Sequence, residues 1–307
     1  MKNENPFKNQ IQSLNLKIGP YQVHAVPTGL FGLDGGAMFG TVPKVLWEKS
    51  NPPDELNRIA MEARALLLCD AKSNRNVLID CGIGGDFVEK YGDKLGPKFA
   101  EQYSVDSDTV SLESSLLKRG LTTDDITDVI LTHLHFDHAG GATRFRDGGL
   151  KPTFNKAKYF VQSANLKTAS APNRRERASY FAANFQPLLE AGALIQLDGP
   201  VENLLPGISV GVSNGHTEGQ QYVRISDGTS TLYYCGDVIP TSSHVRLAWV
   251  MGYDLRPLDL IEEKAALLKS ATAENAYLFF EHDPYMDVAT VASDRADFSV
   301  SHRFAII

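Results

Sequence analysis

The sequence predicts an α/β protein built from two β-sheets that are faced by helices, a layered α/β sandwich. Two observations carry this prediction. Short apolar runs bounded by turn residues lead into helical segments, and this order occurs twice along the chain. The chain also shows no internal repeat, low-complexity tract or long linker, so we expect residues 1–307 to form a single domain.

The first half of the chain is predicted to consist of strands that lead into helices. Residues 63–82 predict a hairpin whose turn is built from Ser73, Asn74 and Asn76. Residues 31–53 are rich in glycine and proline and predict a long loop. Further strands are expected at residues 21–29, 127–132 and 157–162, and helices at residues 108–118 and 163–192 with their polar and basic residues exposed.

The second half repeats the pattern. The amphipathic segment 258–271 predicts a helix, and the sequence SDGTS at residues 226–230 predicts a hairpin turn between two strands. Strands are expected at residues 192–198, 207–213, 221–226, 231–237, 275–283 and 295–307.

Composition and charge exclude several classes of protein. The formal net charge of −7 argues against partners such as nucleic acid or an anionic membrane surface. The first residues lack the apolar region of a secretory signal, and no apolar run is long enough to span a membrane. Cys69, Cys81 and Cys235 are widely spaced and predict small buried apolar residues rather than disulfides. We therefore expect a cytoplasmic protein.

A histidine cluster lies in the stretch VILTHLHFDHAGG, residues 129–141, which holds three of the 8 histidines of the chain. In a helix, residues two apart point about 200° away from each other, whereas in an extended segment they lie on one side. Because the cluster follows an apolar strand, His133 and His135 are predicted to bind one metal ion together. Asp137 and His138 are adjacent and must diverge, which favours a second ion beside the first.

The remaining metal ligands are expected at the ends of other strands. His216 follows the apolar run GISVGVS, Asp237 ends the run TLYYCG, and His282 ends the run AYLFFE. Catalytic and binding residues often lie on loops at strand ends, because the packed strands hold those loops in position. These three side chains are therefore candidates to complete the metal site.

The motifs THLHFDHAGG, GHTEG, GD and a late EH resemble those of the metallo-β-lactamase superfamily of metal-dependent hydrolases. The resemblance implies a four-layer αββα sandwich, the metallo-β-lactamase fold, with the site along one edge of its two sheets. It implies that Asp237 bridges two ions and that Asp80, in the sequence VLIDCG, orients a ligating histidine. It assigns His133, His135 and His216 to the first ion, and Asp137, His138 and His282 to the second.

Such a site predicts hydrolysis by a metal-activated hydroxide. Two divalent ions that share a water lower its pKa toward about 7 and polarise the scissile oxygen. Asp137 is then the candidate catalytic residue, because a carboxylate at this place can accept the proton of the attacking group. Zinc is the first expectation for the metal, and manganese, iron or cobalt are alternatives, since all of them bind nitrogen and oxygen ligands.

The closest resemblance is to the branch that contains N-acyl-homoserine lactone lactonases and methyl parathion hydrolase. A small carboxylic ester or lactone is therefore the first expectation for the substrate, with a phosphotriester or phosphodiester as the alternative. Those lactonases carry a tyrosine a few residues beyond the bridging aspartate, and this chain has none until Tyr253. A non-catalytic, metal-containing sensor protein on the same fold is a third reading.

Apolar side chains near the motifs are candidates to line a substrate pocket, with packing in the core as the alternative. The segment 163–191 is a candidate lid or homodimer surface. His24 and His302 are expected to be structural. The candidate substrate-contacting residues are Met38, Phe39, Phe136, His244 and Trp249.

Overall fold

The computed structural model describes residues 5–106, 110–295 and 297–307, and the chain divides into two compact units. Both units are assembled from segments that alternate along the sequence. The first comprises Met1–Gly19, Gly32–Met61 and Pro200–Ile307, and the second comprises Pro20–Phe31 and Glu62–Gly199.

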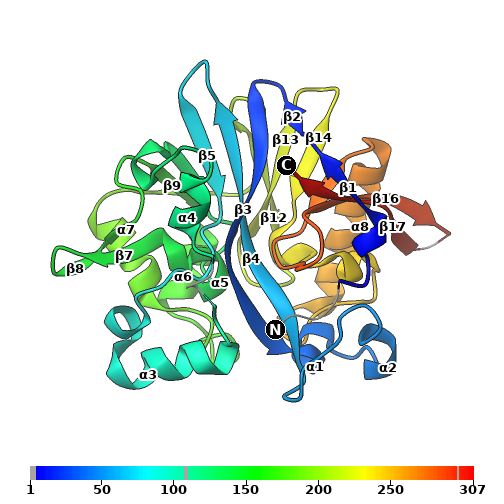
Figure 1. Cartoon of the computed structure of the whole chain (residues 1–307), viewed down its shortest axis with the longest axis horizontal. Coiled ribbons are helices and arrows are strands. Elements are labelled where there is room, and N and C mark those ends of the chain that lie inside the picture. Colours follow the sequence, from blue (N-terminus) through cyan, green and yellow to red (C-terminus); the bar gives the residue numbers. More distant parts are fainter. Residues whose placement is uncertain (1–4, 107–109, 296) are drawn as a thin grey trace. The chain divides into compact units, whose positions relative to one another are not determined.

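The second unit is built on a seven-stranded sheet (Figure 1). Its strands β5, β6, β9 and β10 pair in parallel, whereas β4 and β5 are antiparallel and form the predicted hairpin. In sheet order the strands are Leu194–Leu197 (β10), Lys158–Gln162 (β9), Asp128–Ile130 (β6), Arg75–Ile79 (β5), Arg58–Asp70 (β4), Tyr21–Asp34 (β3) and Lys17–Ile18 (β2). Of these, β2, the last residues of β3 and the first residues of β4 are counted in the first unit.

Helices and one small hairpin complete the second unit. The hairpin joins Thr143–Arg146 (β7) to Gly149–Pro152 (β8). The helices are Phe87–Tyr103 (α3), Leu112–Leu117 (α4), Thr123–Asp125 (η2), Phe136–Ala139 (α5), Gly140–Ala142 (η3), Ser163–Ser170 (α6), Ala182–Asn184 (η4) and Gln186–Glu190 (α7).

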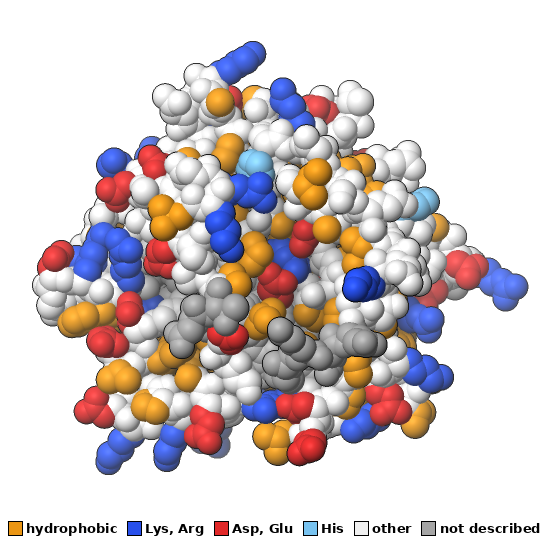
Figure 2. All heavy atoms as spheres, viewed as in Figure 1, with side chains coloured by type: hydrophobic (Ala, Val, Ile, Leu, Met, Phe, Trp, Pro, Cys, Tyr) orange, Lys and Arg blue, Asp and Glu red, His pale blue; other side chains and the backbone are white. Residues whose placement is uncertain are grey.

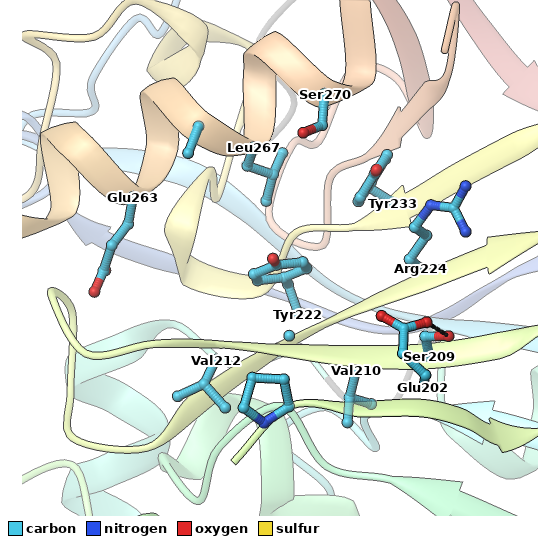
Figure 3. Close-up of a pocket in the computed structure, with 13 residues that line it drawn as sticks. Glu202, Ser209, Val210, Val212, Tyr222, Arg224, Tyr233, Glu263, Leu267 and Ser270 are labelled. Carbon is cyan, nitrogen blue, oxygen red and sulfur yellow. Dashed lines mark hydrogen bonds between the residues drawn. The ribbon is translucent and has the colours of Figure 1, made fainter. Parts of the chain in front are cut away.

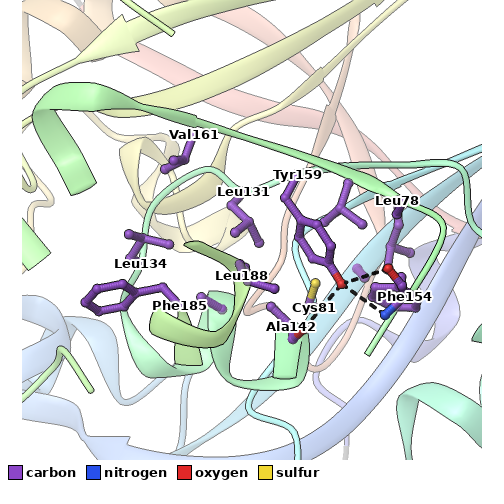
Figure 4. Close-up of a cluster of buried hydrophobic side chains, with 14 of the residues drawn as sticks. Leu78, Cys81, Leu131, Leu134, Ala142, Phe154, Tyr159, Val161, Phe185 and Leu188 are labelled. Carbon is purple, nitrogen blue, oxygen red and sulfur yellow. Dashed lines mark hydrogen bonds between the residues drawn. The ribbon is translucent and has the colours of Figure 1, made fainter. Parts of the chain in front are cut away.

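The core of the second unit lies between its sheet and these helices. Leu78, Leu131 and Val161 come from the strand region and pack with Leu188 of α7 (Figure 4). The buried Tyr159 hydroxyl accepts a hydrogen bond from the Phe154 amide at 3.0 Å. The apolar strand segments that precede the histidines are thus fixed in a packed core.

The first unit is built on an eight-stranded sheet whose central strands are antiparallel, apart from the parallel pair β14 and β15. Its strands are, in sheet order, Ile11–Leu14 (β1), Asp297–Ile306 (β17), Val288–Asp294 (β16), Tyr277–Phe279 (β15), Thr231–Tyr234 (β14), Gln220–Ser226 (β13), Ile208–Ser213 (β12) and Val201–Leu205 (β11).

The long helix Pro257–Ala273 (α8) covers this sheet (Figure 1). Proline is favoured in the first turn of a helix, and Leu260, Leu267 and Leu268 fall on one face. That face packs against Leu278 of β15. The short helices of the unit are Lys8–Gln10 (η1), Gly35–Phe39 (α1), Lys44–Trp47 (α2), Gly236–Val238 (η5) and Ser242–Val245 (η6).

The predicted strands and the helix 258–271 are confirmed, apart from residue 296 of the last strand, which lies outside the described residues. Three local predictions need correction. The loop predicted over 31–53 instead contains the end of β3 and the helices α1 and α2. Asn76 lies in β5, so the hairpin turn ends before it. The helix predicted at 108–118 begins at Leu112, where Ser111 accepts a capping hydrogen bond, and residues 108 and 109 lie outside the described residues.

The single helix predicted over residues 163–192 is wrong. The segment forms α6, η4 and α7 with irregular chain between them. Pro172 disfavours helical backbone at Ala171, which adopts φ −144° and ψ 64°. Asn173 then accepts hydrogen bonds from the amides of Arg175 and Glu176, which closes a turn instead of a helix.

The surface shows the mixture of charges that the composition predicts. Lysine and arginine side chains are interspersed with aspartate and glutamate side chains on the face shown in Figure 2. Among the described residues, no helix combines the length and the apolar composition that a membrane crossing requires.

Candidate metal centre

The second unit brings the clustered histidines together as their spacing predicts. His135 has extended backbone, with φ −63° and ψ 155°, and caps the helix α5 that starts at the next residue. His133 and His135 therefore point to one side, and His133 Nε2 lies 3.0 Å from His135 Nδ1. Asp137 and His138 lie in α5, and the His138 ring packs on the His133 ring with a centroid distance of 3.9 Å. All four residues are between 0% and 7% exposed.

The Asp80 carboxylate contacts the His138 imidazole. It accepts hydrogen bonds from the amide and the hydroxyl of Thr132, both at 2.7 Å, and lies 3.1 Å from His138 Nδ1. An imidazole that donates from Nδ1 to a carboxylate leaves its Nε2 lone pair available, which is the form that binds a metal. The distance from His138 Nε2 to Asp137 Oδ1 is 3.9 Å.

Asn165 of α6 fixes the backbone between His133 and His135, and sequence reasoning missed it. Its Oδ1 accepts a hydrogen bond from the Leu134 amide at 2.9 Å, and its Nδ2 donates to the Tyr180 hydroxyl at 3.3 Å. The Tyr180 ring packs on His135 with a centroid distance of 4.6 Å. Asn165 is 0% exposed, so the prediction that the polar residues of this segment are exposed is wrong here.

An aromatic cluster lies on the side of Asp137 that faces α3. Phe136 packs against Phe99 and Tyr103, each at 4.9 Å, and Phe181 packs against Phe99 at 5.7 Å. Burial raises the pKa of the Tyr103 hydroxyl, and the nearby charge of Asp137 raises it further. Sequence reasoning placed no helix here, because Gly92 and Pro97 interrupt the helical pattern of α3.

The first unit brings together the three predicted ligands that lie at strand ends. His216 follows β12, Asp237 lies in η5 after β14, and His282 follows β15. Asp237 lies between the two imidazoles: its Oδ2 is 3.2 Å from His216 Nε2, and its Oδ1 is 3.3 Å from His282 Nε2. A carboxylate that faces two imidazoles through separate oxygens has the arrangement that a bridging ligand requires.

Asp254 orients His216, and sequence reasoning missed this residue too. Its Oδ1 lies 2.9 Å from His216 Nδ1, and its Oδ2 accepts a hydrogen bond from the Met251 amide at 2.7 Å. Burial raises the pKa of the Asp254 carboxyl, and the hydrogen bond from His216 opposes the rise. With Nδ1 donating, His216 turns its Nε2 lone pair toward Asp237.

The candidate pocket residues of the first unit pack against one another. Phe39 stacks on His244 at 4.8 Å and meets Trp249 edge-on at 5.6 Å. His244 donates from Nε2 to the Met38 carbonyl at 2.9 Å, and Thr241 Oγ1 lies 2.7 Å from its Nδ1. Burial lowers the pKa of His244 to about 4, so the imidazole is neutral at neutral pH. Met38, Phe39 and His244 are buried, whereas Trp249 is half-buried; their role in a substrate pocket stays a prediction.

Comparison with known proteins identifies the family. Residues 64–282 match the metallo-beta-lactamase superfamily, and this region covers both sets of candidate ligands. The chain belongs to the metallo-beta-lactamase superfamily. The predicted α/β sandwich of this superfamily is thereby confirmed.

Relatives in this superfamily are named as metal-dependent hydrolases. The structure of a probable metal-dependent hydrolase from Staphylococcus aureus is 30% identical, with a TM-score of 0.83 over 94% of this chain and 98% of that chain. Probable metallo-hydrolases of Mycobacterium tuberculosis and Mycobacterium bovis are 26% identical over 182 residues, which cover 54% of this chain and 54% of each relative. The match thus spans about half the length of these curated relatives.

A more distant structural neighbour is AidC, a dizinc quorum-quenching lactonase. It is 20% identical, with a TM-score of 0.71 over 94% of this chain and 96% of that chain. At this identity the likeness concerns the fold of the superfamily alone.

The donor set fits divalent metals. Buried imidazole nitrogens and carboxylate oxygens converge within each unit, and burying such groups is costly unless a partner or a cation compensates them. Nitrogen and oxygen donors of this kind suit zinc and its neighbours in the first transition series.

Replacing Asn165 by alanine should lower the free energy of unfolding by about 1–3 kcal/mol, because the buried Leu134 amide loses its acceptor. Denaturant unfolding measures the loss. Lys167→Ala, at an exposed position of the same helix, is the control and should cost little. Equal stability of Asn165→Ala and the wild type would contradict the assigned role.

Lys264 of α8 holds the segment that carries His244 and Trp249. Its Nζ donates to the carbonyls of His244, Arg246 and Trp249 at 2.8–3.2 Å. Burial lowers the pKa of Lys264 from 10.5 to about 8. Between these two values the unfolded chain binds more protons than the folded one, so the contribution of Lys264 to stability rises with pH.

The stability of the wild type relative to Lys264→Met should therefore increase by up to about 3 kcal/mol as the pH rises from about 7.5 to 10.5. Denaturant unfolding at several pH values measures the difference. Lys269→Met, at an exposed position of α8, is the control and should show a flat difference. A difference for Lys264→Met that stays flat or falls with pH would contradict the lowered pKa.

Proposed function

We propose that the chain is a dinuclear-metal-dependent hydrolase that holds two divalent ions with buried imidazoles and carboxylates. The observation that carries this proposal is the buried ligand set of each unit, in which imidazoles are already oriented by carboxylates. Membership of the superfamily and the names of the relatives support it. The proposed ligands are His133, His135 and His216 for one ion, Asp137, His138 and His282 for the other, and Asp237 for both.

When bound, two such ions lower the pKa of water and polarise the oxygen of the bond to be broken. Asp80 and Asp254 keep His138 and His216 in the metal-binding orientation. Asp137 accepts the proton of the attacking group and delivers it to the leaving oxygen as the bond breaks. Zinc is the proposed metal, and manganese, iron and cobalt suit the same donors.

The proposed substrate is a small carboxylic ester or lactone with an apolar acyl group, as in the lactonase-like branch of the superfamily. The aromatic cluster of Phe99, Tyr103, Phe136 and Phe181 supports this choice, because it places apolar surface beside Asp137. We propose that the protein acts without a nucleic-acid or membrane partner. We also propose that it is located in the cytoplasm. A lid or homodimer role of residues 163–191 stays a prediction; Leu166, Phe185 and Leu188 of this segment belong to the core.

Metal-loaded wild-type protein should contain close to two equivalents of divalent metal per chain and hydrolyse acyl lactones. Asp137→Asn should lower kcat by about 100-fold or more and leave the far-UV circular dichroism spectrum unchanged. Asp93→Asn, an exposed position in α3, is the matched control and should keep full activity. Activity of Asp137→Asn near that of the wild type would overturn the role of Asp137.

A substrate panel tests the choice of chemistry. Acyl lactones, linear carboxylic esters and phosphotriesters are compared under the same metal loading by proton release. Faster turnover of phosphotriesters would replace the proposed substrate class, and no turnover of any class would favour a non-catalytic, metal-containing protein.

Removing one ring from the aromatic cluster should change the selectivity of the enzyme for the length of the acyl chain. Phe181→Ala should lower kcat/KM for a long-chain lactone about 10-fold relative to a short-chain one, because it removes apolar contact surface that only the long chain reaches. Phe145→Ala, at an exposed position of β7, is the control. Unchanged selectivity in Phe181→Ala would show that this cluster does not contact the acyl group.

A further inference from the structure

The loop that carries His216 is held by a single carboxylate on α8. Glu263 accepts hydrogen bonds from the Ser213 hydroxyl at 2.5 Å, the Asn214 amide at 2.9 Å and the Gly215 amide at 3.0 Å. These are the three residues that directly precede His216. Hydrogen bonds from amides to a carboxylate are charge-assisted and stronger than hydrogen bonds between neutral groups. Glu263 therefore fixes the direction in which the chain leaves β12.

The same loop is seated closely on the start of α8. The Gly215 carbonyl accepts a hydrogen bond from the Arg256 amide at 2.8 Å, and the His216 carbonyl accepts one from the Leu255 amide at 3.1 Å. A Cβ atom on Gly215 would overlap the backbone and side chain of Leu260. Only glycine permits this approach, and a shift of the loop along α8 would break all of these contacts together.

Glu263 reaches the loop from the edge of an open cavity and not from a packed core. The cavity has a volume of about 340 Å³ and is lined, among others, by Tyr222, Leu267 and Glu263 (Figure 3). Because the Glu263 side chain is only half-buried, its replacement leaves no unfilled space in the apolar core. Replacing Glu263 should therefore change the position of the loop more than the stability of the fold.

We propose that Glu263 is a positioning residue that sets His216 for metal binding. The proposal rests on the proposed function, since it requires His216 to be a metal ligand. Asp254 fixes the rotation of the imidazole through Nδ1, and Glu263 fixes the backbone from which the imidazole extends. Residues that hold a metal ligand in place typically change metal affinity 10- to 100-fold when they are replaced.

The test compares Glu263→Ala and Glu263→Gln with Glu262→Ala, an exposed neighbour on the same helix. Two quantities are measured: the zinc affinity in competition with a chelator, and the hydrogen exchange of the Asn214 and Gly215 amides in metal-free protein. We expect Glu263→Ala to exchange these amides faster and to bind zinc 10- to 100-fold less tightly at the site that includes His216. Glu263→Gln keeps one acceptor oxygen and should fall between Glu263→Ala and the wild type, whereas Glu262→Ala should match the wild type.

Faster exchange with unchanged zinc affinity in Glu263→Ala would overturn the proposal, as would unchanged exchange. If Glu263→Ala does not fold, Ser213→Ala removes one of the three hydrogen bonds and should show the same two effects at smaller size. Zinc binding by the wild type is measured separately. Its absence would reject the proposed function, while the exchange measurement would still report whether Glu263 holds the loop.

Discussion

The structure depends on holding buried imidazoles in one orientation by means of carboxylates. Asp80 contacts His138 at 3.1 Å, and Asp254 contacts His216 at 2.9 Å. An imidazole that is held through Nδ1 in this way can bind a metal through Nε2. Because buried polar groups without partners are costly, this constraint accounts for the burial of Asp80 and Asp254.

Both units meet this constraint with the same local plan. An apolar strand ends, a short loop carries the candidate ligand, and a polar side chain from a later helix accepts hydrogen bonds from the loop backbone. Asn165 of α6 accepts from the Leu134 amide in the second unit, and Glu263 of α8 accepts from the Asn214 and Gly215 amides in the first. The packed strands thus determine where each loop starts, and the helix determines its direction.

Local spacing in the sequence predicts part of this arrangement. His133 and His135 lie on one side because alternate residues of an extended segment must do so, and Asp237 was identified because it ends an apolar strand. Asn165 and Asp254 were missed because they act across 31 and 38 residues of chain, which no local pattern reports. Helix α3 was missed because its glycine and proline hide the helical period.

The most direct test of the account is a crystal structure of zinc-loaded protein with anomalous diffraction recorded at the zinc edge. The account predicts two peaks about 3.5–4 Å apart, one contacted by His133, His135 and His216, with Asp237 contacting both peaks. A single peak, or two peaks that Asp237 does not contact, would contradict it.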